Sequence, residues 1–132
     1  MIGYVTLGTA DLEKSSAFYD ALLGTIGAKR FMEEAGYFIA WAKSPEEPSI
    51  AVSIPFNKEP ATVGNGTMVA VYLETPEQVK DFYNKALELG GTCEGKPGFR
   101  PEGAEFGFYG AYFRDLDGNK LNGFCMVQGA NK

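Results

Sequence analysis

The sequence predicts an α+β fold made of two paired βαβββ modules. Two observations carry this prediction: a repeat within the chain, and the same order of elements in each copy. Tyr4–Ala28 aligns without a gap with Met68–Thr92, and six of these 25 aligned positions are identical. Both copies read as an apolar strand, then a helix, then a glycine stop. An internal duplication explains the shared pattern better than chance does.

Each copy begins with an apolar, β-prone run, Ile2–Leu7 in the first and Met68–Leu73 in the second. In the second copy the helix start is well marked. Thr75 can cap it, Pro76 fits the first helical position, and Gln78 stands where a capping box requires it. The residues that then share one helical face are Val79, Phe82, Tyr83, Ala86 and Leu87.

The first copy has an equivalent apolar stripe, and its helix is opened by either Thr9 or Asp11. We interpret both stripes as helices packed on a sheet. The stripe consists of Leu12, Tyr19, Leu22, Leu23 and Ile26.

Three further strands are predicted after each helix. In the first half they are about Arg30–Glu33, Tyr37–Ala42 and Ser49–Phe56; in the second, about Thr92–Gly95, Gly107–Asp115 and Lys120–Val127. Asp117-Gly118 predicts a two-residue hairpin between the last two. Pro55–Gly66 is rich in proline and glycine and is expected to link the halves. The prediction is one domain over residues 1–132, with modules at about 1–56 and 66–128 and a linker at about 57–65.

Composition narrows the class of protein. Hydrophobic residues make up 45% of the chain, which is typical of a globular protein. The net charge is −5 and the 12 basic residues are dispersed, so a nucleic-acid partner is not expected. No apolar run reaches membrane-spanning length and no signal-like start is visible, so no membrane partner is expected and the cytoplasm is the default location. Cys93 and Cys125 are expected to be reduced thiols.

The chain contains no histidine. The commonest metal ligand and the usual acid–base residue near neutral pH are therefore missing. Any chemistry has to come from carboxylates, tyrosine, lysine, arginine, cysteine, amides or hydroxyls.

Three segments together resemble a known family. They are Tyr4–Gly24, Gly64–Val71 ("GNGTMVAV") and Tyr112–Phe124 ("YFRDLDGNKLNGF"). In order and spacing the chain resembles the vicinal-oxygen-chelate superfamily, which includes glyoxalases, bleomycin-resistance proteins and ring-cleaving dioxygenases. The resemblance implies mixed sheets that form a cup-shaped half-barrel around a small-molecule site, with the helices outside. It also implies a homodimer.

Metal-using members of this family carry four ligands, commonly His and Glu or Gln, on the first and last strands of each module. By the resemblance these positions fall on Tyr4, Met68 and Asn122, while the remaining strand offers only Ser49 or Ser53. A neutral phenol, a thioether and an amide supply no negative charge for a hard divalent cation. We therefore predict a site without metal or cofactor.

Strand alternation then gives a predicted lining. The predicted ligand-binding residues are Tyr4, Thr6, Met68, Ala70, Tyr72, Asn122, Phe124 and Arg100. Lys120 is expected near the rim, and Cys125 falls on the opposite side as a buried core residue. The aromatic residues whose facing stays open are Trp41, Phe56, Phe108, Tyr109 and Tyr112.

Gly95–Gly107 is expected to be a mobile loop beside the mouth of the site. Its Lys96 or Arg100 could meet an anionic ligand group, or the loop could simply be solvated. Asp115–Asn119 ("DLDGN") has glycine too early for a calcium loop and is interpreted as a turn.

Three functions are open from the sequence. The first is a metal-free protein that binds or sequesters a small, partly apolar molecule, like the bleomycin-resistance branch. The alternative is a glyoxalase-like lyase or isomerase, with Tyr4 transferring a proton and Asn122 stabilising an oxyanion. Tyrosine hydroxyls are weak bases near neutral pH, so Tyr4 would need an activating neighbour. The third is a structural or regulatory partner that uses a sheet edge.

Overall fold

A computed structural model describes residues 1–129, and the chain divides into two compact units. The first unit, module 1, comprises Met1–Thr67 together with Leu116–Asn119. The second, module 2, comprises Met68–Asp115 and the described chain from Lys120 on.

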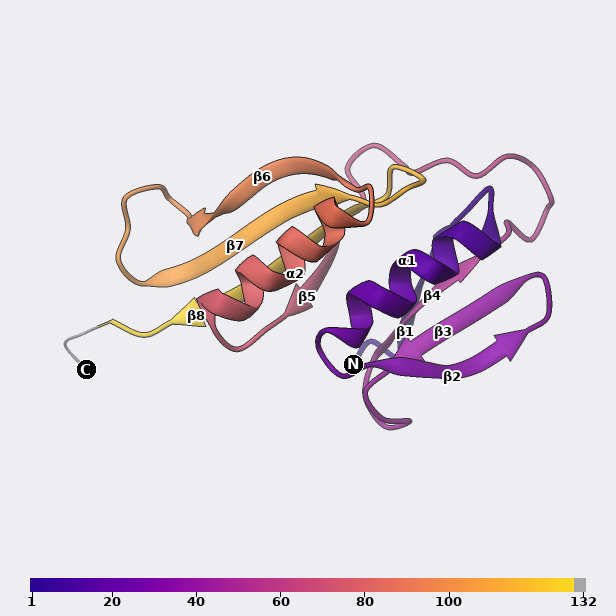
Figure 1. Cartoon of the computed structure of the whole chain (residues 1–132), viewed down its shortest axis with the longest axis horizontal. Helices are drawn as coiled ribbons and strands as arrows, with labels where there is room; N and C mark the ends of the chain where they lie inside the picture. The colour runs from indigo at the N-terminus through magenta and orange to yellow at the C-terminus, as the bar shows by residue number, and fades with distance from the viewer. Residues whose placement is uncertain (130–132) are drawn as a thin grey trace. The chain divides into compact units, whose positions relative to one another are not determined.

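The two modules have the same topology, which confirms the predicted α+β fold with paired βαβββ modules. Module 1 contains β1 (Tyr4–Gly8), α1 (Leu12–Gly24), β2 (Lys29–Glu34), β3 (Phe38–Ala42) and β4 (Ser49–Ser53), in the sheet order β1-β4-β3-β2. Module 2 contains β5 (Val69–Tyr72), α2 (Pro76–Glu88), β6 (Thr92–Phe99), β7 (Gly107–Arg114) and β8 (Lys120–Val127), in the order β5-β8-β7-β6. The first strand of each module pairs in parallel with the last, and the other pairs are antiparallel. Figure 1 shows each helix lying against its own sheet.

The helix starts follow from their capping residues. In α2 the Thr75 hydroxyl accepts a bond from the Gln78 N–H (3.1 Å), and the Gln78 side chain accepts one from the Glu74 N–H (2.8 Å). These bonds satisfy backbone donors that a helix end leaves without partners. In α1 the cap is Asp11, which accepts from the Lys14 N–H (3.1 Å). Of the two predicted openings of α1, the structure therefore has Asp11.

Each helix buries an apolar face against its sheet. In module 2 Phe82 is fully buried and meets Phe113 of β7 edge to face at 5.6 Å. Gly123 of β8 makes room for Phe82, because a Cβ there would lie 2.8 Å from the ring. In module 1 the core pair is Tyr19 of α1 and Trp41 of β3, with ring centroids 5.7 Å apart. Both predicted stripes therefore pack on their sheets.

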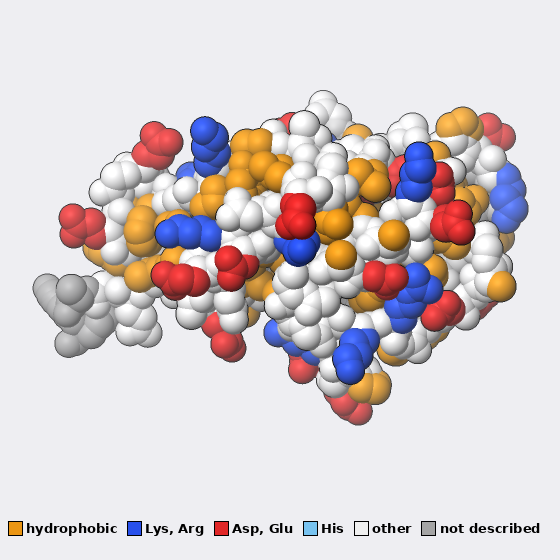
Figure 2. All heavy atoms as spheres, in the orientation of Figure 1, with side chains coloured by type: hydrophobic (Ala, Val, Ile, Leu, Met, Phe, Trp, Pro, Cys, Tyr) orange, Lys and Arg blue, Asp and Glu red, His pale blue; other side chains and the backbone are white. Residues whose placement is uncertain are grey.

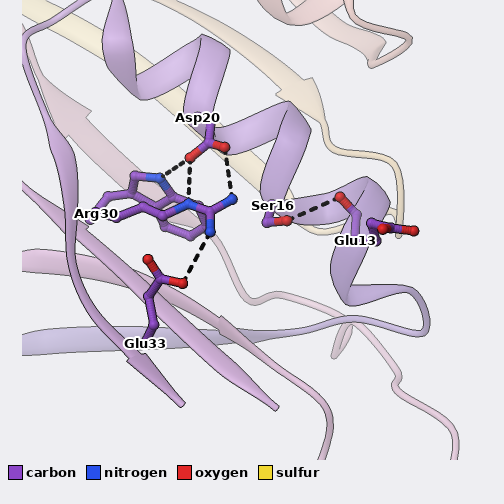
Figure 3. A network of polar contacts seen from close by, with 6 residues as sticks. Glu13, Ser16, Asp20, Arg30 and Glu33 are labelled. Carbon is purple, nitrogen blue, oxygen red and sulfur yellow. Dashed lines mark hydrogen bonds and ion pairs between the residues drawn. The ribbon is translucent and has the colours of Figure 1, made fainter. Parts of the chain in front are cut away.

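A polar network ties α1 to two strands of module 1 (Figure 3). Arg30 of β2 donates two bonds to the Asp20 carboxylate, from Nε (2.9 Å) and Nη2 (2.8 Å). The indole N–H of Trp41 donates to the same carboxylate at 2.9 Å. Arg30 also forms an ion pair with Glu33 at 3.2 Å. The bonds to Arg30 lower the pKa of the Asp20 carboxyl below its ordinary value of 3.8, even though partial burial opposes this shift.

This network predicts a loss of stability in acid. Because the pKa of Asp20 is lower in the folded protein, its charged form stabilises the fold above pH 3.8, and this contribution is lost as the pH falls through the lowered pKa. The Asp20 side chain is 44% exposed, so we expect a contribution of below about 1 kcal/mol. Urea midpoints between about pH 6 and pH 3 should fall less steeply in Asp20→Asn than in the wild type. Asp81→Asn, at an exposed site on α2, should follow the wild type; an equally steep fall in Asp20→Asn would contradict the prediction.

Two strand boundaries differ from the prediction. β4 ends at Ser53 rather than Phe56, because Pro55 has no N–H to continue the ladder. β6 runs to Phe99 instead of ending at Gly95, so the first five residues of the predicted Gly95–Gly107 loop are strand. Pro97 is tolerated there because β6 is an edge strand, and its pairing with β7 shifts register between Gly95 and Gly98.

The connection between β7 and β8 is also longer than predicted. It spans residues 115–119 instead of a two-residue hairpin at Asp117-Gly118. The side chains of this segment explain the extra length, because within module 1 they bond to the backbone at the end of β1 and just after it. Asp117 accepts a bond from the Ala10 N–H (2.9 Å), and buried Asn119 donates to the Gly8 carbonyl (3.0 Å). The interpretation of this segment as a turn is confirmed.

Candidate functional site

Each sheet has one face against its helix and an opposite face, here called the open face. In module 2 the position of Gly123 beneath Phe82 identifies the helix side of β8. Strand alternation then places Asn122 and Phe124 on the open face. Ala70 and Tyr72 of β5 lie beside them, in register with Asn122 and Phe124 respectively.

The open face of module 2 carries a row of aromatic rings. Phe108 of β7 stacks on Phe124 with centroids 5.1 Å apart and planes 9° apart. Tyr72 meets Phe124 edge to face at 5.7 Å. Gly110 makes this stack possible, because a Cβ there would lie 2.6 Å from the Phe108 ring. Met126, on the same face of β8, and Met68, just before β5, are both exposed.

The open face of module 1 presents Tyr4 and Thr6, both exposed. Tyr4 is 60% exposed, and its ring meets Phe38 edge to face at 6.5 Å. Within residues 1–129 its hydroxyl makes no hydrogen bond. Trp41 is on the opposite side of the sheet, in the core.

Asn122 is 1% exposed, and both protons of its amide are used. Nδ2 donates to the carbonyl oxygens of Ala111 (2.9 Å) and Gly123 (3.2 Å). Since only the nitrogen can donate to two carbonyls, the orientation of the amide is fixed. The two amide protons that the predicted oxyanion-donor role of Asn122 would use are therefore engaged with the backbone.

The chemistry of the donors does not fit a hard divalent metal ion. Module 1 offers Tyr4 and its strand neighbour Ser49, and module 2 offers Met68 and Asn122, so all four positions are uncharged. In the part of the chain that the structure describes, no three His, Cys, Asp or Glu side chains are grouped so that they could hold a metal.

Arg100 follows β6 and folds back over the sheet. Its Nη2 donates to the Lys96 carbonyl (2.8 Å), and its guanidinium carbon lies 5.6 Å from the centroid of the Tyr112 ring. Lys120 lies over the same ring at 5.5 Å. Sequence alone left the facing of Tyr112 and Phe108 open, and the β7–β8 register decides it by pairing them with Asn122 and Met126.

The two cysteines lie outside the open faces, and the acidic residues are dispersed. Cys125 is buried, as predicted, and burial raises the pKa of its thiol. Cys93 is exposed, and its hydrogen bond with Tyr83, together with burial of that ring, raises the pKa of Tyr83 to about 12. Figure 2 shows basic and acidic side chains interspersed on the face in view. No helix within residues 1–129 is long and apolar enough to cross a membrane.

Comparisons with known proteins agree with this fold. The chain is similar to a glyoxalase/bleomycin resistance protein from Albidiferax ferrireducens, with 38% identity, a TM-score of 0.81, and coverage of 95% of this chain and 98% of that one. It is also similar to a hypothetical protein from S. aureus (27% identity, TM-score 0.71, coverage 95% and 92%). A lactoylglutathione lyase from Agrobacterium tumefaciens shares the fold at 19% identity (TM-score 0.68, coverage 95% and 92%).

A search of curated protein sequences gave no match. The model of the Glyoxalase/Bleomycin resistance protein/Dioxygenase superfamily matches residues 1–122. The family is thus supported both by sequence and by structure. This chain belongs to the glyoxalase/bleomycin resistance protein/dioxygenase superfamily.

Proposed function

We propose that this protein binds a small, partly apolar molecule without the help of a metal. The observation that carries the proposal is the aromatic row of Tyr72, Phe124 and Phe108 on the open face of module 2. Small-molecule sites are lined mainly by apolar and aromatic side chains with a few polar groups. Asn122, on the same face of β8 as Phe124, is one such polar group beside the row.

Two further observations favour binding over catalysis. The hydroxyl of Tyr4, the only proton carrier that the sequence proposes, has no hydrogen-bonding partner within residues 1–129. The amide protons of Asn122 are already bonded to backbone carbonyls. A lyase or isomerase built on these two residues would need both to be rearranged by its substrate.

The test is a thermal-shift screen of aromatic metabolites, thiol conjugates and antibiotics, followed by titration of the compounds that raise the Tm. Because a buried ring contributes about 1.5–3 kcal/mol, we expect Phe124→Ala to weaken their binding by about tenfold or more. Phe56→Ala removes a ring that is 88% exposed in the linker and should leave binding unchanged. Equal affinity in Phe124→Ala and wild type, or a screen without any binder, would overturn the proposal.

The same compounds should then be assayed for turnover. We expect binding without conversion. If a compound is converted, and Tyr4→Phe abolishes its conversion while leaving its binding intact, the enzyme alternative replaces the binding function. The homodimer and the cytoplasmic location stay predictions from the family resemblance and the sequence.

A further inference from the structure

Two cations flank one ring on the open face of module 2. The guanidinium carbon of Arg100 lies 5.6 Å from the centroid of Tyr112, and Nζ of Lys120 lies 5.5 Å from it. In the sequence Arg100 precedes β7, which carries Tyr112, and Lys120 follows it. A ring attracts such cations by its quadrupole, so both charges are held beside the same ring.

The local sequence is built to hold Arg100 in this place. A Cβ at Gly95 would lie 3.0 Å from the Tyr112 ring and 3.3 Å from Nη2 of Arg100, and one at Gly98 would lie 3.3 Å from Nη1. The two glycines therefore leave the space in which the guanidinium lies. Backbone carbonyls fix it there, since Nη2 donates to Lys96 and Nη1 to Phe99 (3.3 Å). The side chain is thus ordered before any ligand arrives.

Among the described residues, these cations have no carboxylate partner. Within residues 1–129 neither Arg100 nor Lys120 forms an ion pair, although the chain has 17 acidic and 12 basic residues. A guanidinium has five N–H donors, and the backbone bonds of Arg100 leave several of them for another acceptor. Charge-assisted bonds to a carboxylate or phosphate are the strongest that such donors make.

Lys120 and Phe124 of the aromatic row lie on the same face of β8. Lys120, Asn122 and Phe124 alternate along the open face of β8, and Phe124 carries the stack with Phe108. Four residue steps along β8 separate Lys120 from Phe124, roughly 13 Å between backbones. Nζ of Lys120 lies over Tyr112, the strand partner of Asn122, so the charge lies closer to Phe124 than the Lys120 backbone does.

We propose that the ligand of this face is an aromatic carboxylate, with its anionic group at Arg100 and Lys120 and its ring on Phe124. This inference rests on the proposed function, because it names the chemical class that the same face takes. The inference adds that the ligand carries a negative charge, which the proposed function alone does not require.

The test compares phenylbutyrate with its uncharged isostere phenylbutyramide by titration calorimetry on the full chain. Hydrogen bonds to charged groups contribute about 1.5–3 kcal/mol, so phenylbutyrate should bind about tenfold or more tightly than the amide. The double variant Arg100→Gln/Lys120→Gln should remove that preference, so that phenylbutyrate and phenylbutyramide bind about equally. Lys43→Gln/Lys80→Gln, which removes two exposed lysines elsewhere, is the control with the same net charge.

The outcomes separate the two proposals. Phenylbutyrate and phenylbutyramide binding equally, or an unchanged preference in the double variant, would overturn the anion inference while the apolar site stands. Failure of both probes while uncharged aromatic compounds bind would do the same. If no aromatic compound binds at all, the proposed function fails with the inference. Circular dichroism of each variant verifies that a loss of binding is not a loss of fold.

Discussion

Replacing Phe82 by alanine is expected to lower the free energy of unfolding by about 3–5 kcal/mol. Phe82 is fully buried, meets Phe113 edge to face, and rests on the space left by Gly123. Removing the ring forfeits its transfer free energy and leaves a cavity that the sheet beneath cannot fill. Urea or guanidinium unfolding followed by far-UV ellipticity measures the loss. Phe56→Ala should change stability by less than about 0.5 kcal/mol; a similarly small change in Phe82→Ala would contradict the packing described.

The same experiment reports on the coupling of the modules. Trp41 is the only tryptophan of the chain and lies in the core of module 1, so its fluorescence follows that module. Leu116–Asn119 lies between β7 and β8 in the sequence but belongs to module 1, where it bonds to Gly8 and Ala10. We therefore expect Phe82→Ala to shift the fluorescence and ellipticity transitions together. An unchanged fluorescence midpoint would mean that the modules unfold separately.

Replacing Trp41 by alanine should destabilise the protein by a similar amount, about 3–5 kcal/mol. Trp41 is buried, packs against Tyr19, and donates its indole N–H to the Asp20 carboxylate at 2.9 Å. The variant loses the ring and also leaves Asp20 with one donor fewer. Because the variant has no tryptophan, its unfolding is followed by ellipticity alone.

Two matched variants separate the contributions of Trp41. Trp41→Phe keeps part of the ring but has no N–H to donate to Asp20, so its stability should fall between those of wild type and Trp41→Ala. Phe31→Ala, at a partly exposed ring on β2, should cost much less. A loss in Trp41→Ala no larger than that in Phe31→Ala would show that the indole is not a core anchor.

The fold could be predicted from local sequence signals because they act over few residues. Thr75, Pro76 and Gln78 start a helix in any context that exposes its first turn, and the structure has their bonds as expected. The spacing of Val79, Phe82, Tyr83, Ala86 and Leu87 likewise requires one face against the sheet; the first four are buried and Leu87 is half-buried. Boundaries were less predictable, because Pro97 could end a strand in the centre of a sheet but is tolerated at the edge that β6 occupies.

The candidate site, like the fold, could be predicted only in part from the sequence. Alternation along single strands was enough to place Asn122 and Phe124 on one face and Cys125 in the core. It could not show that the amide protons of Asn122 donate to Ala111 and Gly123, because those bonds depend on the register between β7 and β8.

By itself, then, the sequence determined the repeat, the α+β class and the neutral donor set that does not suit a hard metal ion, since these depend on residue identity and local spacing. Only the tertiary structure decided that Arg100 and Lys120 both lie against the Tyr112 ring and that Phe108 stacks on Phe124. These contacts join residues from different strands, so they follow from sheet pairing and from the space left by Gly95 and Gly110. No pattern along one strand contains that information.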